Sequence, residues 1–252
     1  MKSKLAVLPL LFFLLVPFQG YCLPLIDAEI AVGGWLNSPK GFAGYKGDNL
    51  YLENDLGYDD ETKLTARARI ELPLILPNLT VMATNLNYEE RSTMGRKFTF
   101  GGKNFEENKS FNSELKLDHY DFALSFSLPF LKLASLGTLQ ADLGVNLRLV
   151  DLDASITQGE IKESKSFTVP IPMGFAYLRL EPVSGIALEA EGRMISLGGN
   201  NVTSLIGRLR YNIFGPLFIA GGYRVEKFDI DEKDVRVDTK FKGPFFEGGF
   251  KF

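Results

Sequence analysis

The sequence has few of the residues on which most metal proteins and many enzymes depend. Its one cysteine, Cys22, excludes a disulfide framework, and its one histidine, His119, excludes the paired histidines of most zinc enzymes. No basic block stands out among 28 Lys and Arg against 31 Asp and Glu, so nucleic acid is not an expected partner. We therefore expect neither a metal nor a cofactor.

Long apolar runs are also missing beyond Val16, so no helix of the roughly 18 or more apolar residues needed to cross a bilayer is predicted there. The segment before it has the pattern of a secretory signal: Lys2 and Lys4, an apolar run over 5–16, and the small residues Gly20 and Cys22. We predict a signal peptide over 1–22 and a mature domain over 23–252. A lipoprotein would instead keep Cys22 as its first residue, but the residue before it, Tyr21, is bulky for such a signal.

The mature chain alternates between apolar and polar residues with a period of two. From Leu64 to Leu72 every even position is apolar and every odd position is polar or charged, and the alternation recurs over 139–149 and 205–213. This period is typical of strands with one apolar and one polar face. Strands of at least nine residues match the roughly 9–11 that cross a bilayer at a tilt. We predict ten strands, over 26–35, 62–75, 78–89, 112–128, 138–154, 165–181, 185–197, 202–213, 216–230 and 241–252.

The connections between these strands divide by length. Those after the even-numbered strands are short, over 76–77, 129–137, 182–184 and 214–215. Those after strands one, three, five and nine are longer and polar, with 36–61 and 90–111 the longest; only 198–201 is tight. This asymmetry is typical of outer-membrane barrels, which have short periplasmic turns and longer extracellular loops. The predicted fold is a closed antiparallel transmembrane β-barrel of about ten strands.

Charged residues occupy the polar phase of the strands. Facing lipid, each Arg or Lys near the midplane would cost about 2–4 kcal/mol, so we expect these residues to face the barrel interior. The predicted lumen-lining charges are Arg67, Arg69, Glu71, Asp142, Arg148, Glu189, Glu191, Arg193, Arg208, Arg210, Arg224 and Glu226, with Asp121, Glu247 and Lys251 in the same phase.

Aromatic residues gather near the predicted strand ends, where rings sit at the two bilayer interfaces. On the loop side these are Trp35, Tyr88, Phe167 and Phe228; on the turn side they are Phe126, Tyr177, Tyr211, Phe250 and Phe252. The final Phe252 shares a strand face with Phe250, which resembles the signal that barrel insertion machinery reads in outer-membrane proteins.

Four segments carry a narrower resemblance: LPLIDAEIAVGGW over 23–35, LDHYD over 117–121, PIPM over 170–173 and GPFFEGGF over 243–250. With them, the chain resembles a family of outer-membrane β-barrel proteins of Gram-negative bacteria. The resemblance implies a porin-like barrel in the cell outer membrane, in contact with its lipids and lipopolysaccharide. It assigns no functional residue.

The single histidine lies among residue types that some surface barrel enzymes use for catalysis. His119 lies between Asp118 and Tyr120, with Asp121 next, and omptin-like surface proteases use Asp and His near the barrel rim. The apolar phase slips here from odd positions to even ones, which predicts a β-bulge. A lipid hydrolase would pair the histidine with a serine, but Ser125 and Ser127 lie several residues nearer the periplasmic end.

Two loop features remain open. Acidic residues cluster at 55, 59, 60 and 61 and at 229, 231, 232 and 234; such groups can hold Ca²⁺ or bridge divalent ions to lipopolysaccharide phosphates, but neither has a calcium-loop spacing, so we expect a solvated surface. Apolar residues flank Gly101-Gly102 over 97–105, which predicts a hairpin that either covers the barrel mouth or extends the wall.

A ten-stranded barrel is narrow, and inward arginines would constrict it further. We expect an integral outer-membrane protein without catalytic activity, with a structural or surface role or a narrow solute passage. The alternatives are a surface enzyme, an omptin-like protease or lipid hydrolase, that uses His119, or a soluble periplasmic ligand carrier. The sequence does not indicate an oligomeric state.

Overall fold

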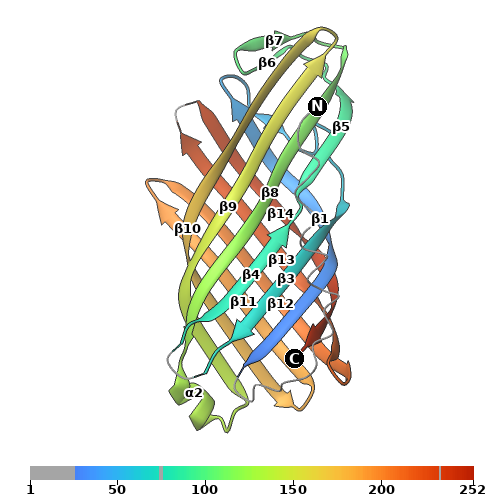
Figure 1. Ribbon diagram of the computed structural model, residues 1–252. Helices are drawn as coiled ribbons and strands as arrows, with labels where there is room; N and C mark the ends of the chain where they lie inside the picture. Colours follow the sequence, from blue (N-terminus) through green and yellow to red (C-terminus); the bar gives the residue numbers. More distant parts are fainter. Residues whose placement is uncertain (1–25, 74–75, 233) are drawn as a thin grey trace, which may run out of the picture.

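The chain forms a closed, antiparallel, ten-stranded β-barrel (Figure 1). The computed structural model describes residues 26–73, 76–232 and 234–252, so the predicted signal peptide over 1–22 lies outside the described residues. Each barrel strand pairs with its neighbour in sequence, and pairing of β14 with β1 closes the cylinder. The fold class predicted from the two-residue period is confirmed.

The bounds of the elements follow the period-two segments. The barrel strands are β1 (Asp27–Tyr45), β3 (Glu61–Glu71), β4 (Asn78–Thr84) with β5 (Asn87–Thr93), β8 (Ser110–Ser127), β9 (Leu139–Gln158), β10 (Ile161–Val183), β11 (Ile186–Leu197), β12 (Asn200–Phe214), β13 (Leu217–Glu232) and β14 (Val235–Lys251). The two-residue β2 (Leu50–Tyr51) pairs with β1 in the same sheet. Outside this sheet lie the hairpin of β6 (Phe98–Phe100) and β7 (Lys103–Phe105) and the short helix α2 (Pro129–Ala134).

The third barrel strand is interrupted. Both β4 and β5 pair with β8, and the chain leaves the ladder between them at Asn85 and Leu86. The Asp118 carboxylate accepts hydrogen bonds from the Leu86 amide at 2.7 Å and from the Asn85 side chain at 3.1 Å. A side chain thus replaces the missing partner of a backbone amide.

Several strands run farther than predicted. β1 continues ten residues past the expected end at 35, and the segments 155–164 and 231–240, predicted as long loops, are mostly strand. The expected short turn over 129–137 contains α2. The long loops expected over 36–61 and 90–111 are therefore shorter, over 46–60 and 94–109, and the expected long loops after strands five and nine are wrong.

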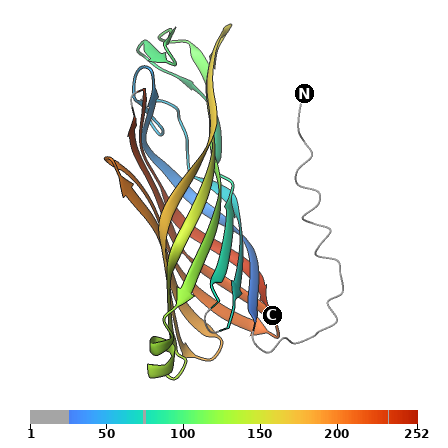
Figure 2. The same cartoon turned by 60° about the vertical axis from the view of Figure 1, so that its left-hand side comes forward.

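The two ends of the barrel differ in length. At one end, here the terminal end, Lys251 pairs with Asp27 at 3.4 Å, and α2 lies at the same end (Figure 1). At the other, here the extended end, the β9–β10 pair rises beyond the tips of β11 and β12 (Figure 2). β10 has 23 residues, whereas about 9–11 suffice to cross a bilayer, so about half of this strand is available to project beyond one.

The polarity of the wall reverses along the strands. Near the terminal end of β9, Leu143, Val145 and Leu147 face outward while Asp142, Asn146 and Arg148 are buried inside. Towards the extended end of the same strand, Asp151 and Asp153 face outward, and Val150 and Ile156 are buried inside. We call the outward apolar zone near the terminal end the belt. Side chains on the outer face match the medium around the barrel, whereas side chains of the opposite polarity are buried inside. The outer face of the belt therefore suits hydrocarbon, and the outer face of the extended end suits water.

The reversal also explains the phase slip in β8. The pairing of β8 with β9 continues from Asn112↔Thr157 to Ser127↔Asp142 without a register shift, so the predicted bulge near His119 is wrong. Leu115, Leu117, His119 and Asp121 all face inward from one regular strand. The inward side chains change from apolar to polar along this strand. In the sequence, that change looks like a shift of the apolar positions by one residue.

Candidate functional site

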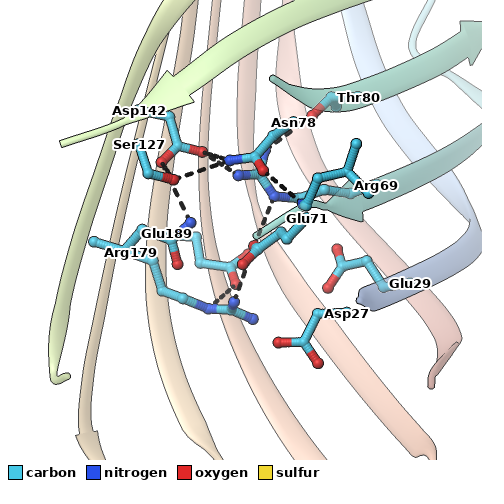
Figure 3. Close-up of polar contacts among 12 residues, drawn as sticks. Asp27, Glu29, Arg69, Glu71, Asn78, Thr80, Ser127, Asp142, Arg179 and Glu189 are labelled. Atoms are coloured by element: carbon cyan, nitrogen blue, oxygen red, sulfur yellow. Dashed lines mark hydrogen bonds and ion pairs between the residues drawn. The ribbon is translucent and has the colours of Figure 1, made fainter. Parts of the chain in front are cut away.

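The interior of the belt is filled by ion pairs. Near the terminal end, Arg69 donates to Glu71 at 3.0 Å and also pairs with Asp142, while Arg179 lies 3.1 Å from Glu189 and 3.5 Å from Glu71 (Figure 3). Five side chains from four strands, β3, β9, β10 and β11, thereby connect opposite parts of the wall. Charge-assisted hydrogen bonds of this kind are the stronger class of hydrogen bond.

A second group surrounds Arg208. Its guanidinium contacts Glu29 at 2.6 Å and also pairs with Glu189 and Glu247, so three carboxylates from β1, β11 and β14 converge on one cation. Arg210 contacts the same Glu29 at 2.9 Å. Because Glu29 bridges two arginines, this group ties the closing strand pair to the middle of the sheet.

A third group lies nearest the extended end. Arg148 contacts Asp121 at 2.9 Å and Glu226 at 2.7 Å, and Glu226 also receives hydrogen bonds from Arg224 at 2.6 Å and Ser204 at 2.7 Å. All of these side chains are buried. Removal of one carboxylate would leave an arginine without its partner in a water-poor interior.

The histidine lies in this third group. His119 Nδ1 is 2.9 Å from the Leu117 carbonyl oxygen and its Nε2 is 3.2 Å from Arg224, and the ring has no exposed surface. Asp121 faces inward beside it, whereas Asp118 faces outward. The arrangement positions His119 between arginines rather than in an open cleft at the rim.

The structure places every predicted lumen-lining charge inside the barrel. Glu29 and Arg179 also face the interior but are not among the predicted lumen-lining charges. Each lies two residues along its strand from an inward side chain and therefore points to the same side of the wall. Among the residues that the structure describes, the interior ion pairs join eight arginines, at 67, 69, 148, 179, 193, 208, 210 and 224, to eight carboxylates, at 29, 71, 121, 142, 189, 191, 226 and 247. These two sets balance in charge.

The predicted interface aromatics divide into two groups. Tyr211, Phe250 and Phe252 are exposed on the outer face at the terminal end, as expected. Trp35, Tyr88 and Tyr177 are buried inside, so their placement at a lipid interface is wrong, and Phe167 and Phe228 also face inward. The reason is their phase: Trp35 covers the Arg224 guanidinium at 4.6 Å and Tyr177 that of Arg69 at 3.9 Å, which are cation–π contacts.

An apolar core closes the extended end. Its buried members include Trp35, Leu52, Tyr58, Tyr88, Phe98, Phe105, Phe111, Leu117, Phe228 and Phe241. The predicted hairpin over 97–105 is confirmed as β6–β7, and it forms its own two-stranded sheet instead of extending the wall. Phe98 stacks on Phe105 at 4.9 Å and packs against Phe111 at 5.1 Å, so the hairpin folds inward onto the barrel mouth.

Two buried phenols belong to this core. Tyr88 donates a hydrogen bond to the Asn37 side chain, and the two rings of Tyr58 and Tyr88 lie 5.4 Å apart. Burial raises the pKa of both phenols above the usual value. They therefore stay neutral to higher pH than an exposed tyrosine does, as expected for rings packed in an apolar core.

One apolar cavity lies in the same region. Its volume is about 50 Å³, and Leu115, Leu152, Phe167 and Val237 contribute to its walls. Lys165 is the basic residue among its lining side chains, with Nζ 5.7 Å from the Tyr45 ring centre. An engineered cavity of about 150 Å³ holds benzene, so this space suits only a group of a few carbon atoms.

Truncation of the hairpin's central ring tests the packing of the mouth. We expect Phe98→Ala to weaken closure by about 3–5 kcal/mol, because the substitution removes a fully packed aromatic side chain. Trypsin should then cleave faster at Lys97 and Lys103. Thr99→Ala, which removes one exposed side-chain hydrogen bond, serves as the matched control and should leave cleavage unchanged. Equal cleavage of both variants would show that the rings do not hold the hairpin.

The fold and the interior together define a class: a closed antiparallel barrel with an apolar outer belt and a charge-paired core. Ail of Yersinia pestis, solved with a heparin analogue, is similar over 90% of this chain and 99% of its own, with 11% identity and a TM-score of 0.36. The transport unit of the autotransporter AIDA-I from Escherichia coli is similar over 94% and 92%, with 9% identity and a TM-score of 0.37. A FadL homologue of Pseudomonas aeruginosa covers 90% of each chain, with 9% identity and a TM-score of 0.29.

At these identities, no activity or ligand of those proteins carries over to this chain. No family model and no curated protein matches the sequence. Among the described residues, no group of three or more His, Cys, Asp or Glu side chains is placed to hold a metal ion. In the same part of the chain, no helix is long and apolar enough to cross a membrane.

Proposed function

We propose that this protein is an integral outer-membrane β-barrel with a sealed interior and a water-exposed β-structured extension, and that it acts at the cell surface without catalysis. The observation that carries the proposal is the reversal of wall polarity along single strands. A chain surrounded by water throughout would not expose a zone with Leu143, Leu205 and Leu209 while burying Arg148 and Arg208 behind it.

The packing of the interior favours a surface role over a solute passage. Arg148 and Arg193 have no exposed surface, and Arg208 and Arg224 are almost as deeply buried. A solute moving along the barrel axis would have to separate these ion pairs, and breaking a buried pair costs about 3–5 kcal/mol. The hairpin β6–β7 and the apolar core then cover the mouth.

The surroundings of His119 argue against the enzyme alternative. A general base must come within hydrogen-bond reach of the proton that it abstracts. Both ring nitrogens of His119 already contact protein groups, and the ring is fully buried behind Arg224. Asp118, the second candidate partner, faces away from it.

Conductance measurements test the sealed interior. We expect the full-length protein, reconstituted in planar bilayers, to show no steady conductance steps, because buried ion pairs fill the barrel. A porin reconstituted in the same bilayers provides the positive control. Stable steps in the absence of any substitution would contradict the sealed interior and favour the narrow passage.

Fractionation tests the location separately. We expect the protein to leave the membrane fraction only with detergent and to change its electrophoretic mobility on heating. Recovery in the soluble fraction would overturn the membrane assignment and favour the periplasmic carrier.

A further inference from the structure

Three lysines, one each on β1, β14 and β13, lie side by side on the outer wall of the barrel. These three strands are neighbours in the sheet (Figure 1). Lys240 of β14 is directly opposite Lys40 of β1 and directly opposite Lys227 of β13. Lys242 lies in the next row towards the belt, opposite Ser38 and Val225. We call Lys40, Lys227, Lys240 and Lys242 together the lysine row.

Like charges directly opposite one another in a sheet destabilise it, because the facing Cβ atoms are only about 4.5–5.5 Å apart. Two of the four have carboxylate partners: Lys40 contacts Glu53 at 3.1 Å, and Lys227 contacts Asp229 at 3.2 Å and Asp238 at 4.0 Å. Among the described residues, Lys240 and Lys242 have no acidic partner. The row therefore carries positive charge that the protein itself does not neutralise.

The height of the row on the wall identifies its surroundings. One row below Lys242, Tyr223 is opposite Pro244, and the outward side chains from there on are apolar, including Leu36 and Phe246. Adjacent outward positions on a strand are about 7 Å apart, so the amines lie directly above the belt. This is the level of lipid headgroups, where tyrosines such as Tyr223 also gather.

The rest of this border is not basic. On β8 and β9 the outer face carries Glu114, Asp118, Asp151 and Asp153 around Lys116, which pairs with Asp151 at 3.1 Å. On β11 and β12 it carries Ser196 and Thr203. The lysine row is thus a local feature of one side of the barrel rather than a general property of the rim.

We propose that the lysine row is a binding site for the phosphorylated headgroup of an outer-leaflet glycolipid, with Lys240 and Lys242 as the principal phosphate contacts. The proposal rests on the proposed function, since it requires the belt to lie in the outer membrane. Two unpaired amines in successive rows suit a headgroup with more than one phosphate, because each ammonium acts as a point charge with three donors.

The test uses the full-length protein in detergent micelles, which avoids any dependence on insertion. Bisphosphorylated lipid A is titrated, and native mass spectrometry measures the concentration at which half the protein retains one lipid. We expect this concentration to rise at least ten-fold, about 1.4 kcal/mol, in the Lys240→Gln/Lys242→Gln variant. Dephosphorylated lipid A should bind both proteins equally weakly.

Lys97→Gln/Lys162→Gln is the matched control, since it removes two exposed lysines far from the row and should leave retention unchanged. Equal retention by the row variant and the unsubstituted protein would overturn the proposal. Equal losses in both double variants, or retention of phosphatidylglycerol as tight as that of lipid A, would overturn it too. Failure to fractionate with membranes would instead overturn the proposed function, which the mobility assay reads independently.

Discussion

Leu143→Arg is expected to lower the free energy of unfolding by about 2–4 kcal/mol, measured by urea titration of the protein folded in phosphatidylcholine vesicles. Leu143 faces outward near the middle of the belt on β9 and is 55% exposed. In water, arginine at so exposed a position would cost little. A large penalty therefore reports hydrocarbon at this surface.

Ser155→Arg is the matched control, on the same strand and the same outer face, twelve residues nearer the extended end. It also introduces an arginine, and the residues directly opposite Ser155, Glu114 on β8 and Ser164 on β10, carry no positive charge. We expect a change within about 0.5 kcal/mol, as for surface substitutions generally. Similar changes in both variants would contradict the polarity reversal on which the membrane assignment depends.

Glu226→Gln is expected to destabilise the folded barrel by about 3–5 kcal/mol in the same titration, since it breaks a buried ion pair without changing the side-chain shape. Glu226 is fully buried, 2.7 Å from Arg148 and 2.6 Å from Arg224. The substitution leaves Arg224 without its carboxylate partner, although Arg148 keeps Asp121.

Glu114→Gln removes the same charge from an exposed position on β8 and should change stability by less than about 0.5 kcal/mol. If Glu226→Gln proved as mild as this control, the interior would have to admit enough water to solvate Arg224. That result would also weaken the case against a solute passage.

The barrel itself was predictable because its signal is local. The alternation from Leu64 to Leu72 needs only two-residue spacing, and the same phase assigns Arg67, Arg69 and Glu71 to the interior, where the structure places them. Strand number and closure followed from repeating that reading along the chain. The partners of each charge did not, because Arg67 meets Glu191 across the barrel, 124 residues away.

The extended end was misread for a physical reason. The prediction of interface aromatics uses only their position near a strand end. It assumes that the outward face is apolar and the inward face polar along the whole strand. Trp35 and Phe228 obey the opposite rule, because their strands leave the belt and turn their apolar face inward. The polar outer residues of 155–164 and 231–240 looked like loops for the same reason. The sequence does contain a signal of this reversal, because the apolar residues move from odd to even positions within one strand over 117–120.

The unequal length of the strands sets an order of assembly. In the proposed membrane placement, Asp151 and Asp153 lie beyond the belt, so a chain inserted from the terminal end would carry these carboxylates across the hydrocarbon before they reach water. The packed rings of Phe98, Phe105 and Phe111 join the hairpin to β8, so they can pack only after both segments have reached the extended end. We therefore expect the strand tips to cross as open hairpins and the aromatic core to form afterwards.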